Sequence, residues 1–459
     1  MYINTPEKKI KRSLGILMLT VIGVSGTIGG SIFVLLSGGI ELAGAYTPHA
    51  YLLAGMLAML GGLLYAEVGT TIPRPGAGLS YVFSAFKNRH YPFLFSWTIL
   101  LGDLGYLAIN AIGFGFYLGL VLNVPPVLVA LAAIALSVAI NLRGLEKAGK
   151  AEISVLAALL LLFTAFGLYV SSSPNNFAPL TFDELHISGV IAATALLFTS
   201  FIGYEYIATM AGEAKNAARS IPIAMVATVT ISTLVFSGVA YITLIGAPMA
   251  DLAASDAPLL LVGETIGGLS NAIIIPAALL ATSGSLIAAT MVASRRLYAI
   301  SKEGFFGAYI QKTNKHRIPS RALVVCGVLA AALVATQAVN FVAYMSNAVY
   351  LMSLITISSS VIILRKKRPY LDRPFKAPFY PVIPFIIIGL ALTLIAFIDV
   401  ASIGLVIIWV TIGWFTYLLG SIDNQRWQLL IKGATIFLFA LLLTILISSY
   451  TVLQSLLTQ

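Results

Sequence analysis

The sequence predicts an all-α membrane protein with two inverted five-helix repeats, helices 1–5 and 6–10, and two or three peripheral C-terminal helices. Three observations predict this fold: the composition, the length of the apolar runs and the placement of the basic residues. Of the 459 residues, 59% are hydrophobic and only 10% are charged. A soluble domain of this size needs more charge to cover its surface, so the apolar excess indicates contact with lipid.

The apolar runs have the length of membrane-spanning helices, because about 20 helical residues cross ~30 Å of hydrocarbon. We expect thirteen spans, at residues 13–37, 48–71, 92–121, 125–142, 151–172, 187–211, 221–246, 271–300, 320–337, 342–364, 380–398, 402–420 and 429–450. They divide the chain into a cytoplasmic tail (1–12), a first five-helix unit (13–172), a second unit (187–364) and peripheral C-terminal helices (365–459).

The basic residues orient these spans. If residue 1 is cytoplasmic, all 27 Lys and Arg residues fall on the cytoplasmic side, whereas the outer loops 173–186 and 247–270 carry acids and no Lys or Arg. Retention of Lys and Arg on the inner side explains this bias. The net charge of +10 therefore indicates topology and not nucleic-acid binding, and we expect a multi-pass protein of the cell membrane.

Two of the spans contain helix-breaking patterns. The first holds Gly23, Gly26, Gly29 and Gly30 near its centre, and the sixth holds the run 198–205, with hydroxyls, a glycine and a carboxylate. Such small residues also let helices pack closely in lipid, which is the alternative interpretation. The two breaks, however, open the two five-helix units. Paired glycine-interrupted helices in an inverted repeat are the best sequence indication of a transporter site at the bilayer midplane.

A broken helix leaves backbone N–H and C=O groups unpaired at membrane depth, where they are tolerated if they line a cavity or meet a ligand. A half-helix N-terminus offers N–H donors to a carboxylate, and freed carbonyls attract an ammonium group. An amino-acid zwitterion has both of these groups.

Several ordered motifs resemble one family of transporters. They are the run 24–33 (VSGTIGGSIF), Tyr65-Ala66-Glu67 followed by Pro73-Arg74-Pro75-Gly76-Ala77-Gly78, the run 200–205 (SFIGYE) followed by Gly212-Glu213-Ala214-Lys215-Asn216, Ser294-Arg295-Arg296-Leu297-Tyr298, and Arg373-Pro374-Phe375-Lys376. Each motif is loose alone, but together, over about residues 13–420, they resemble amino acid–polyamine–organocation (APC) transporters.

The resemblance implies the leucine-transporter fold and a secondary active transporter that works by alternating access around helices 1 and 6. By position it implies that Ser25, Gly26 and Thr27 present backbone N–H groups to the substrate carboxylate, and that Phe201, Ile202 and Gly203 surround the amino group and form part of the gate. The full set of expected substrate-binding residues is Ser25, Gly26, Thr27, Ile28, Gly29, Asn110, Thr199, Ser200, Phe201, Ile202, Gly203 and Leu286.

Three positions depart from branches of that family. Thr199 and Leu286 align with places where arginine/agmatine-type antiporters carry aromatic residues, which argues against recognition of a guanidinium group. Leu159 aligns with the fifth-helix lysine of some proton-coupled members, so that coupling device is missing here.

Two carboxylates within the spans are candidates for proton coupling or gating. Asp103 lies near the middle of the third span, and Glu205 directly follows the sixth-span break. A carboxylate at membrane depth is costly unless it is neutralised, partnered or exposed to water, so function is the default hypothesis. A structural hydrogen-bonding role is the alternative for each. Glu67, at the inner end of the second span, is expected to pair with nearby basic residues.

Asn110 and the hydroxyls of the eighth span are the remaining polar candidates. Asn110 could orient a substrate or bond a neighbouring helix. Thr282 and Ser283, with Ser285 beside them, lie where sodium-coupled relatives of the fold place hydroxyl ligands, but Ser and Thr in membrane helices often bond their own backbone. The four histidines show no metal-ligand spacing, so we expect no metal and no cofactor.

The sequence therefore favours a transporter of neutral or small amino acids, with proton-coupled symport or exchange. Sodium symport and amino acid/polyamine antiport remain alternatives within the same class. A channel and a non-transporting membrane sensor are alternatives from other classes. We do not expect an enzyme, because the sequence contains no phosphate-binding loop and no nucleophile elbow.

Overall fold

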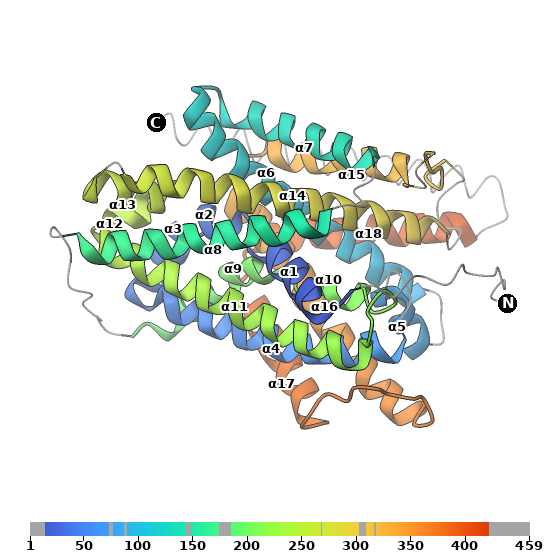
Figure 1. Cartoon of the computed structure of the whole chain (residues 1–459). Coiled ribbons are helices and arrows are strands. Elements are labelled where there is room, and N and C mark those ends of the chain that lie inside the picture. The colour runs from blue at the N-terminus through green and yellow to red at the C-terminus, as the bar shows by residue number, and fades with distance from the viewer. Residues whose placement is uncertain are drawn as a thin grey trace.

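The computed structural model describes residues 14–72, 77–86, 90–143, 148–173, 185–267, 269–302, 309–315 and 318–421. The expected cytoplasmic tail 1–12 and the thirteenth span 429–450 lie outside the described residues. Within them the chain is a bundle of helices, shown in Figure 1.

The first half of the described chain contains the helices of the first unit. They are α1 (Ile16–Thr27), α2 (Ser31–Val34), α3 (Leu36–Ala43), the 3₁₀ turn η1 (Gly44–Tyr46), α4 (Thr47–Thr71), α5 (Ala77–Ala85), α6 (His90–Leu122), α7 (Pro126–Arg143) and α8 (Ala148–Ser172). The second unit begins with another broken helix. Its elements are α9 (Ile187–Leu197), the 3₁₀ turn η2 (Phe198–Phe201), α10 (Tyr206–Thr209), α11 (Ala217–Gly246), α12 (Met249–Ala254), α13 (Pro258–Ile266), α14 (Leu269–Lys302), α15 (Ser320–Ala335) and α16 (Val339–Lys367). Two peripheral helices follow, α17 (Val382–Ile395) and α18 (Val400–Ser421).

Ten segments among the described residues are long and apolar enough to cross a membrane, and the shorter apolar helices α15 and α17 add two more. These twelve correspond to the first twelve predicted spans. The short helices α5, α12 and α13 lie between spans and were not predicted, because apolar-run length does not detect helices of six to nine residues. The division into units and their inverted relation stay predictions.

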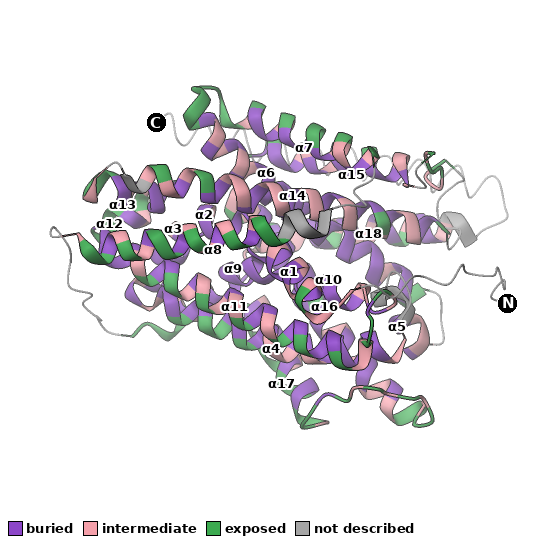
Figure 2. Ribbon diagram, in the orientation of Figure 1, coloured by how far each residue is buried: buried purple, intermediate pink, exposed green. Residues whose placement is uncertain are grey.

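Helix α6 lies at the centre of the bundle and packs against α14, α7, α16, α15 and α18. All of its residues from Phe95 to Asn110 are buried. Figure 2 shows the contrast with α7, α8 and α11, whose outer faces are exposed. Their exposed side chains include Leu128, Leu161 and Leu234, which is the pattern of helices that face lipid.

The peripheral helix α18 is fixed to α6 by a reciprocal pair of tryptophans. The rings of Trp97 and Trp409 stack with centroids 4.4 Å apart, and each indole N–H donates to the backbone carbonyl of the other residue at 2.8 Å. Gly413 lies against the Trp97 ring. Since both indole N–H groups have hydrogen-bond acceptors inside the protein, the pair joins the two helices without leaving either N–H unsatisfied.

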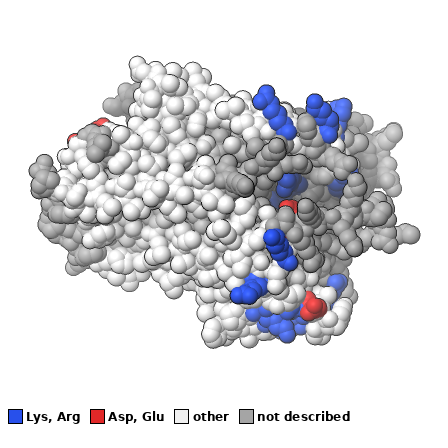
Figure 3. All heavy atoms as spheres, in the orientation of Figure 1, with Lys and Arg blue, Asp and Glu red and all other residues white. Residues whose placement is uncertain are grey.

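Lys and Arg side chains gather at one end of the molecule. Figure 3 shows the described Lys and Arg residues at this end together with a few acids, then an uncharged middle zone, and acids at the opposite end. This distribution is the one expected for a protein whose middle zone lies in the bilayer.

Candidate functional site

The first broken helix opens between α1 and α2. The last helical hydrogen bond of α1 runs from the Ile28 N–H to the Val24 carbonyl at 2.7 Å, and Ile28 is extended with ψ 90°. The break is narrower than the sequence indicates, because Ser25, Gly26 and Thr27 still belong to α1. The expected amide donors at these three residues therefore lie within a helical turn, and the unwound residues are Ile28, Gly29 and Gly30.

Side chains from α6 and α14 bind the backbone groups of this break. Tyr106 donates its hydroxyl to the carbonyls of Gly26, at 2.7 Å, and Thr27, at 3.3 Å. Ser285 donates to the carbonyls of Ser25, at 2.9 Å, and Ile28, at 3.3 Å. Here the backbone is the donor instead: the Asn110 Oδ1 atom accepts a hydrogen bond from the Gly30 N–H at 2.8 Å. We call Tyr106, Asn110 and Ser285 the clasp.

The clasp explains why the break contains glycine. A Cβ at Gly29 would lie 2.8 Å from the Ser285 Oγ and 2.9 Å from the Tyr106 hydroxyl, and it would clash with the Asn110 side chain. A Cβ at Gly30 would lie 3.2 Å from the Ile109 carbonyl oxygen. The two glycines let α6 approach the unwound backbone closely enough to bind it.

The second broken helix opens after η2. Gly203 has φ +117°, a conformation that side chains other than glycine rarely adopt, and its N–H donates to the Glu205 Oε2 atom at 3.0 Å. Asn347 of α16 donates to the carbonyls of Ala195, at 2.6 Å, and Leu196, at 2.8 Å, at the end of α9. Thr199 donates to the Leu196 carbonyl at 3.0 Å.

The second break touches the last turn of α1, directly before the first break, through backbone. A Cβ on Gly203 would lie 2.6 Å from the Gly26 carbonyl carbon and 3.1 Å from the Thr27 nitrogen, so residue 203 has no room for a side chain. The broken helices also meet at the basic end, where Leu14 exchanges backbone hydrogen bonds with Glu213, at 3.1 Å, and Lys215, at 2.9 Å. The structure thus brings together the two segments that the sequence singled out.

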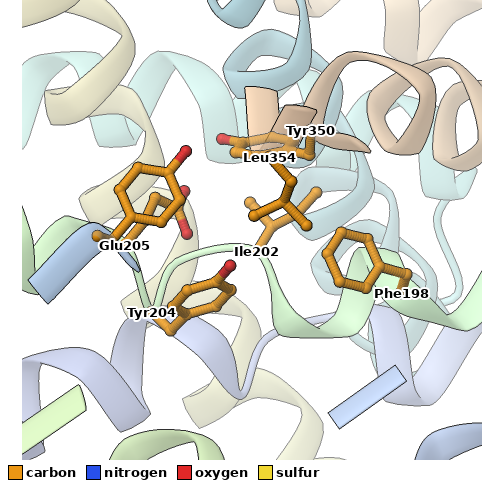
Figure 4. A pocket seen from close by; sticks show the side chains of 7 residues that line it. Phe198, Ile202, Tyr204, Glu205, Tyr350 and Leu354 are labelled. Atoms are coloured by element: carbon orange, nitrogen blue, oxygen red, sulfur yellow. The ribbon is translucent and has the colours of Figure 1, made fainter. Parts of the chain in front are cut away.

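Two small cavities lie beside the second break. Figure 4 shows the first, with the Glu205 side chain at one end, Phe198 at the other and Ile202 between them. Its volume is about 10 Å³, and Tyr350 and Leu354 complete its wall with Tyr65 and Tyr204. The second, of about 20 Å³, shares Tyr65, Glu205 and Tyr350 and extends to Tyr81, Thr209 and Arg296. Each is close to the size that holds a single water molecule.

The two candidate carboxylates have different surroundings. Asp103 is fully buried and forms an ion pair with Arg296 of α14, and it also accepts the Tyr350 hydroxyl at 2.7 Å. Glu205 is also buried and binds its own turn through Oε2, while its Oε1 atom has no hydrogen-bond partner among the described residues. Asp103 is therefore neutralised within the protein, whereas Glu205 keeps an unsatisfied oxygen beside the cavities.

Several other predicted residues are less directly placed. Thr282 and Ser283 bond their own helix, at the carbonyls of Ala278 (2.6 Å) and Leu280 (3.1 Å). The Phe201 ring packs edge-on against Phe236 of α11, with centroids 5.3 Å apart. Ser200 and Leu286 are both buried. Glu67 does pair with basic residues, as expected, through Arg365 and Arg373.

Sequence reasoning did not include Tyr106, Arg296, Asn347 or Tyr350 among the site residues, and it considered Ser285 only as a neighbour of the possible cation ligands. One feature of the sequence could have identified Tyr106. Asp103, Tyr106 and Asn110 are spaced three and four residues apart, which places them on one face of a helical stretch, 99–113, whose other residues are apolar. A polar stripe of this kind inside a membrane span indicates contact with a polar site.

Comparison with known proteins settles the family. A family model described as amino acid permease matches residues 14–417. The chain belongs to the amino acid permease family, within the APC superfamily. It is similar to the branched-chain amino acid permease BcaP of Bacillus subtilis (strain 168), with 28% identity over 92% of this chain and 95% of that protein. The methylthioribose transporter of the same organism is 26% identical over 91% of this chain and 95% of its own length. The human cationic amino acid transporter 4 is 24% identical over 79% of this chain and 61% of its length.

The family and the spanning helices make this permease a multi-pass membrane protein that acts in amino acid transport.

Proposed function

We propose that this permease carries a neutral amino acid with a small or branched aliphatic side chain by alternating access, coupled to protons through Glu205. We place residue 1 on the cytoplasmic side of the cell membrane, because the described basic residues gather at the end where α1 begins. The observation that carries the proposal is the clasp at the first break.

The clasp reproduces both polar ends of an amino acid. The Tyr106 and Ser285 hydroxyls donate to backbone carbonyls, as an ammonium group would, and the Asn110 oxygen accepts a backbone N–H, as a carboxylate would. The unwound backbone therefore offers acceptors and a donor in the polarity that a zwitterion needs. In this proposal the substrate replaces part of the clasp when it binds, which keeps the backbone groups of the break satisfied in both states.

The surroundings favour a neutral side chain. A cationic side chain would need a carboxylate of its own. Asp103 is already paired with Arg296, and in this proposal Glu205 carries the coupled proton. Phe198, Ile202 and Leu354 give the cavity beside the break a mostly apolar wall. The relative BcaP, whose name specifies branched-chain amino acids, supports the same substrate class.

Proton coupling is assigned to Glu205 and not to Asp103. Glu205 hydrogen-bonds the Gly203 N–H, so a change in its charge acts directly on the turn that touches Gly26. Asp103 joins α6 to α14, two helices that also pack together along their length. Sodium is the weaker alternative, because the hydroxyls of Thr282 and Ser283 bind their own backbone carbonyls.

The test is uptake of radiolabelled amino acids into proteoliposomes, with pH and sodium gradients imposed separately. We expect leucine, isoleucine or valine to accumulate with an inward proton gradient and arginine not to compete. Accumulation driven by sodium alone would overturn the coupling assignment. Competition by arginine as strong as that by leucine would overturn the substrate class.

A further inference from the structure

The segment between α16 and α17 concentrates basic residues at one edge of the molecule. Six Lys and Arg side chains lie within residues 365–376, and Asp372 is the one acidic residue between 365 and 381. Figure 3 shows a dense group of Lys and Arg atoms at the lower right, where this segment lies in Figure 1. We call residues 365–381, which are the last three residues of α16 and the chain that follows them, the α16–α17 loop.

Two of the six cations turn inward and fold this loop. The Arg365 guanidinium binds both carboxylate oxygens of Glu67, with Nε 2.9 Å from Oε1, and the Ala377 N–H donates to Glu67 Oε2 at 2.8 Å. Arg373 donates to the carbonyls of Leu364, at 2.8 Å, and Arg368, at 3.0 Å. Glu67 is 3% exposed, so the inner end of α4 anchors the loop through a buried, charge-assisted network.

Four cations remain. Lys366, Lys367 and Lys376 are exposed, and Arg368 is half-buried. Two aromatic side chains beside them are also exposed, Tyr370 at 78% and Phe379 at 77%. Helix α17 then starts with the exposed apolar residues Val382, Phe385 and Ile386, which continue into the lipid-facing surface.

This sequence of side chains matches a membrane–water interface. Aromatic side chains are enriched at headgroup level, and lysines directly beyond a spanning helix attract anionic headgroups. The three lysines lie on backbone that α16 and the Glu67 network already hold in place, so little backbone freedom is lost when they bind a phosphate. A solvated charged face alone would not explain two large exposed aromatic side chains between the lysines and the lipid-facing helix.

We propose that Lys366, Lys367 and Lys376, on the loop anchored by Glu67, form a binding site for the phosphate of an anionic phospholipid, with Tyr370 and Phe379 beside its acyl chains. This site is separate from the breaks, and the proposal does not depend on which amino acid is carried.

The first experiment titrates the purified full chain, in detergent, with short-chain phosphatidylglycerol or phosphatidylcholine and follows the temperature of thermal unfolding. We expect a saturable rise with phosphatidylglycerol and none with phosphatidylcholine. In the triple variant Lys366→Gln, Lys367→Gln, Lys376→Gln, the unfolding temperature without lipid should stay the same, and half-saturation should require at least roughly tenfold more lipid. The matched control is Lys302→Gln, Lys312→Gln, Lys315→Gln, which removes three exposed cytoplasmic-end lysines outside the loop and should titrate like the wild type.

Two outcomes of that titration would overturn the site. Equal weakening in both triple variants would show that net charge alone attracts the lipid. An equal thermal shift with glycerol phosphate would show a site for free phosphate and not for a lipid.

A second variant tests the anchoring. Glu67→Gln keeps every cation but removes the charge that binds Arg365 and Arg373. We expect it to weaken phosphatidylglycerol binding about as much as the triple variant. Wild-type lipid affinity in Glu67→Gln would refute a site that depends on the folded loop.

Discussion

The two broken helices differ in where their backbone groups find partners. At the first break, the partners are side chains of other helices: Tyr106 and Asn110 of α6 and Ser285 of α14. At the second break, the Gly203 N–H is bound by Glu205 of the same turn, and Asn347 of α16 binds the carbonyls before it. One break is held by neutral groups from outside, and the other contains a carboxylate within its own turn.

The difference suggests that the first break binds the substrate and that the second break responds to the proton. Neutral hydroxyl and amide groups do not change charge across the physiological range, so the first break offers a constant pattern of donors and acceptors to a substrate. A carboxylate can gain or lose a proton, so the second break can respond to one. Because Gly203 touches the Gly26 carbonyl, we expect a change at the second break to act on the last turn of α1, directly before the first break.

The contact between the breaks gives the largest expected effect. Gly203→Ala places a methyl group against the Gly26 carbonyl and forces a side chain into φ +117°. We expect uptake into proteoliposomes to fall at least ~100-fold, with normal insertion in the membrane. The matched control is Gly238→Ala in α11, where a Cβ meets nothing within 4 Å and uptake should be unchanged. Near-normal uptake by Gly203→Ala would mean that the breaks do not need this contact.

The two buried carboxylates give the second test. Asp103→Asn removes one partner of a buried ion pair and leaves Arg296 uncompensated, which costs about 3–5 kcal/mol. We expect a lower unfolding temperature, partly restored in the double variant Asp103→Asn, Arg296→Gln, and uptake that still responds to an imposed pH gradient in the protein that folds.

Glu205→Gln should do the opposite. The amide keeps an oxygen that can accept the Gly203 N–H, so stability should change little, while acceleration of uptake by a proton gradient should disappear. Retained pH-driven accumulation in Glu205→Gln, together with its loss in a folded Asp103→Asn protein, would assign the proton to Asp103 instead.

The fold was predictable because each spanning helix corresponds to a long apolar run that can be recognised in the sequence. Twelve apolar runs correspond to described helices, and the glycines at 26, 29 and 30 and at 203 lie at or beside the observed breaks. Span length and glycine content are properties of one stretch of chain, so both can be read directly from the sequence. The short helices α5, α12 and α13 lack such a signal.

The partners of the breaks were harder to predict because they are long-range. Gly30 and Asn110 are 80 residues apart, and Ser25 and Ser285 are 260 apart. A single sequence places Ser285 on α14. It does not say which of the neighbouring hydroxyls, Thr282, Ser283 or Ser285, forms a hydrogen bond outside α14. The structure shows that Ser285 does, whereas the other two bond carbonyls three and four residues back.

The smallest expected effect comes from the clasp itself. Removing one of its side chains is expected to leave the substrate Kd unchanged or to lower it. If Ser285 occupies acceptors that the substrate ammonium uses, Ser285→Ala removes a competitor of the substrate. A neutral hydrogen bond contributes about 0.5–1.5 kcal/mol, so we expect the substrate Kd to stay the same or fall by up to roughly tenfold, while the substrate-free protein loses stability.

The measurement is equilibrium binding of leucine to the purified variant, with Thr290→Ala as the matched control. Thr290 lies further along α14 and donates to the Leu286 carbonyl, away from the first break, so its removal should leave the Kd unchanged. A Kd raised severalfold in Ser285→Ala alone would show that this hydroxyl contacts the substrate directly. The first break would then bind its ligand through a scaffold side chain as well as through backbone, and the contrast between the two breaks would narrow.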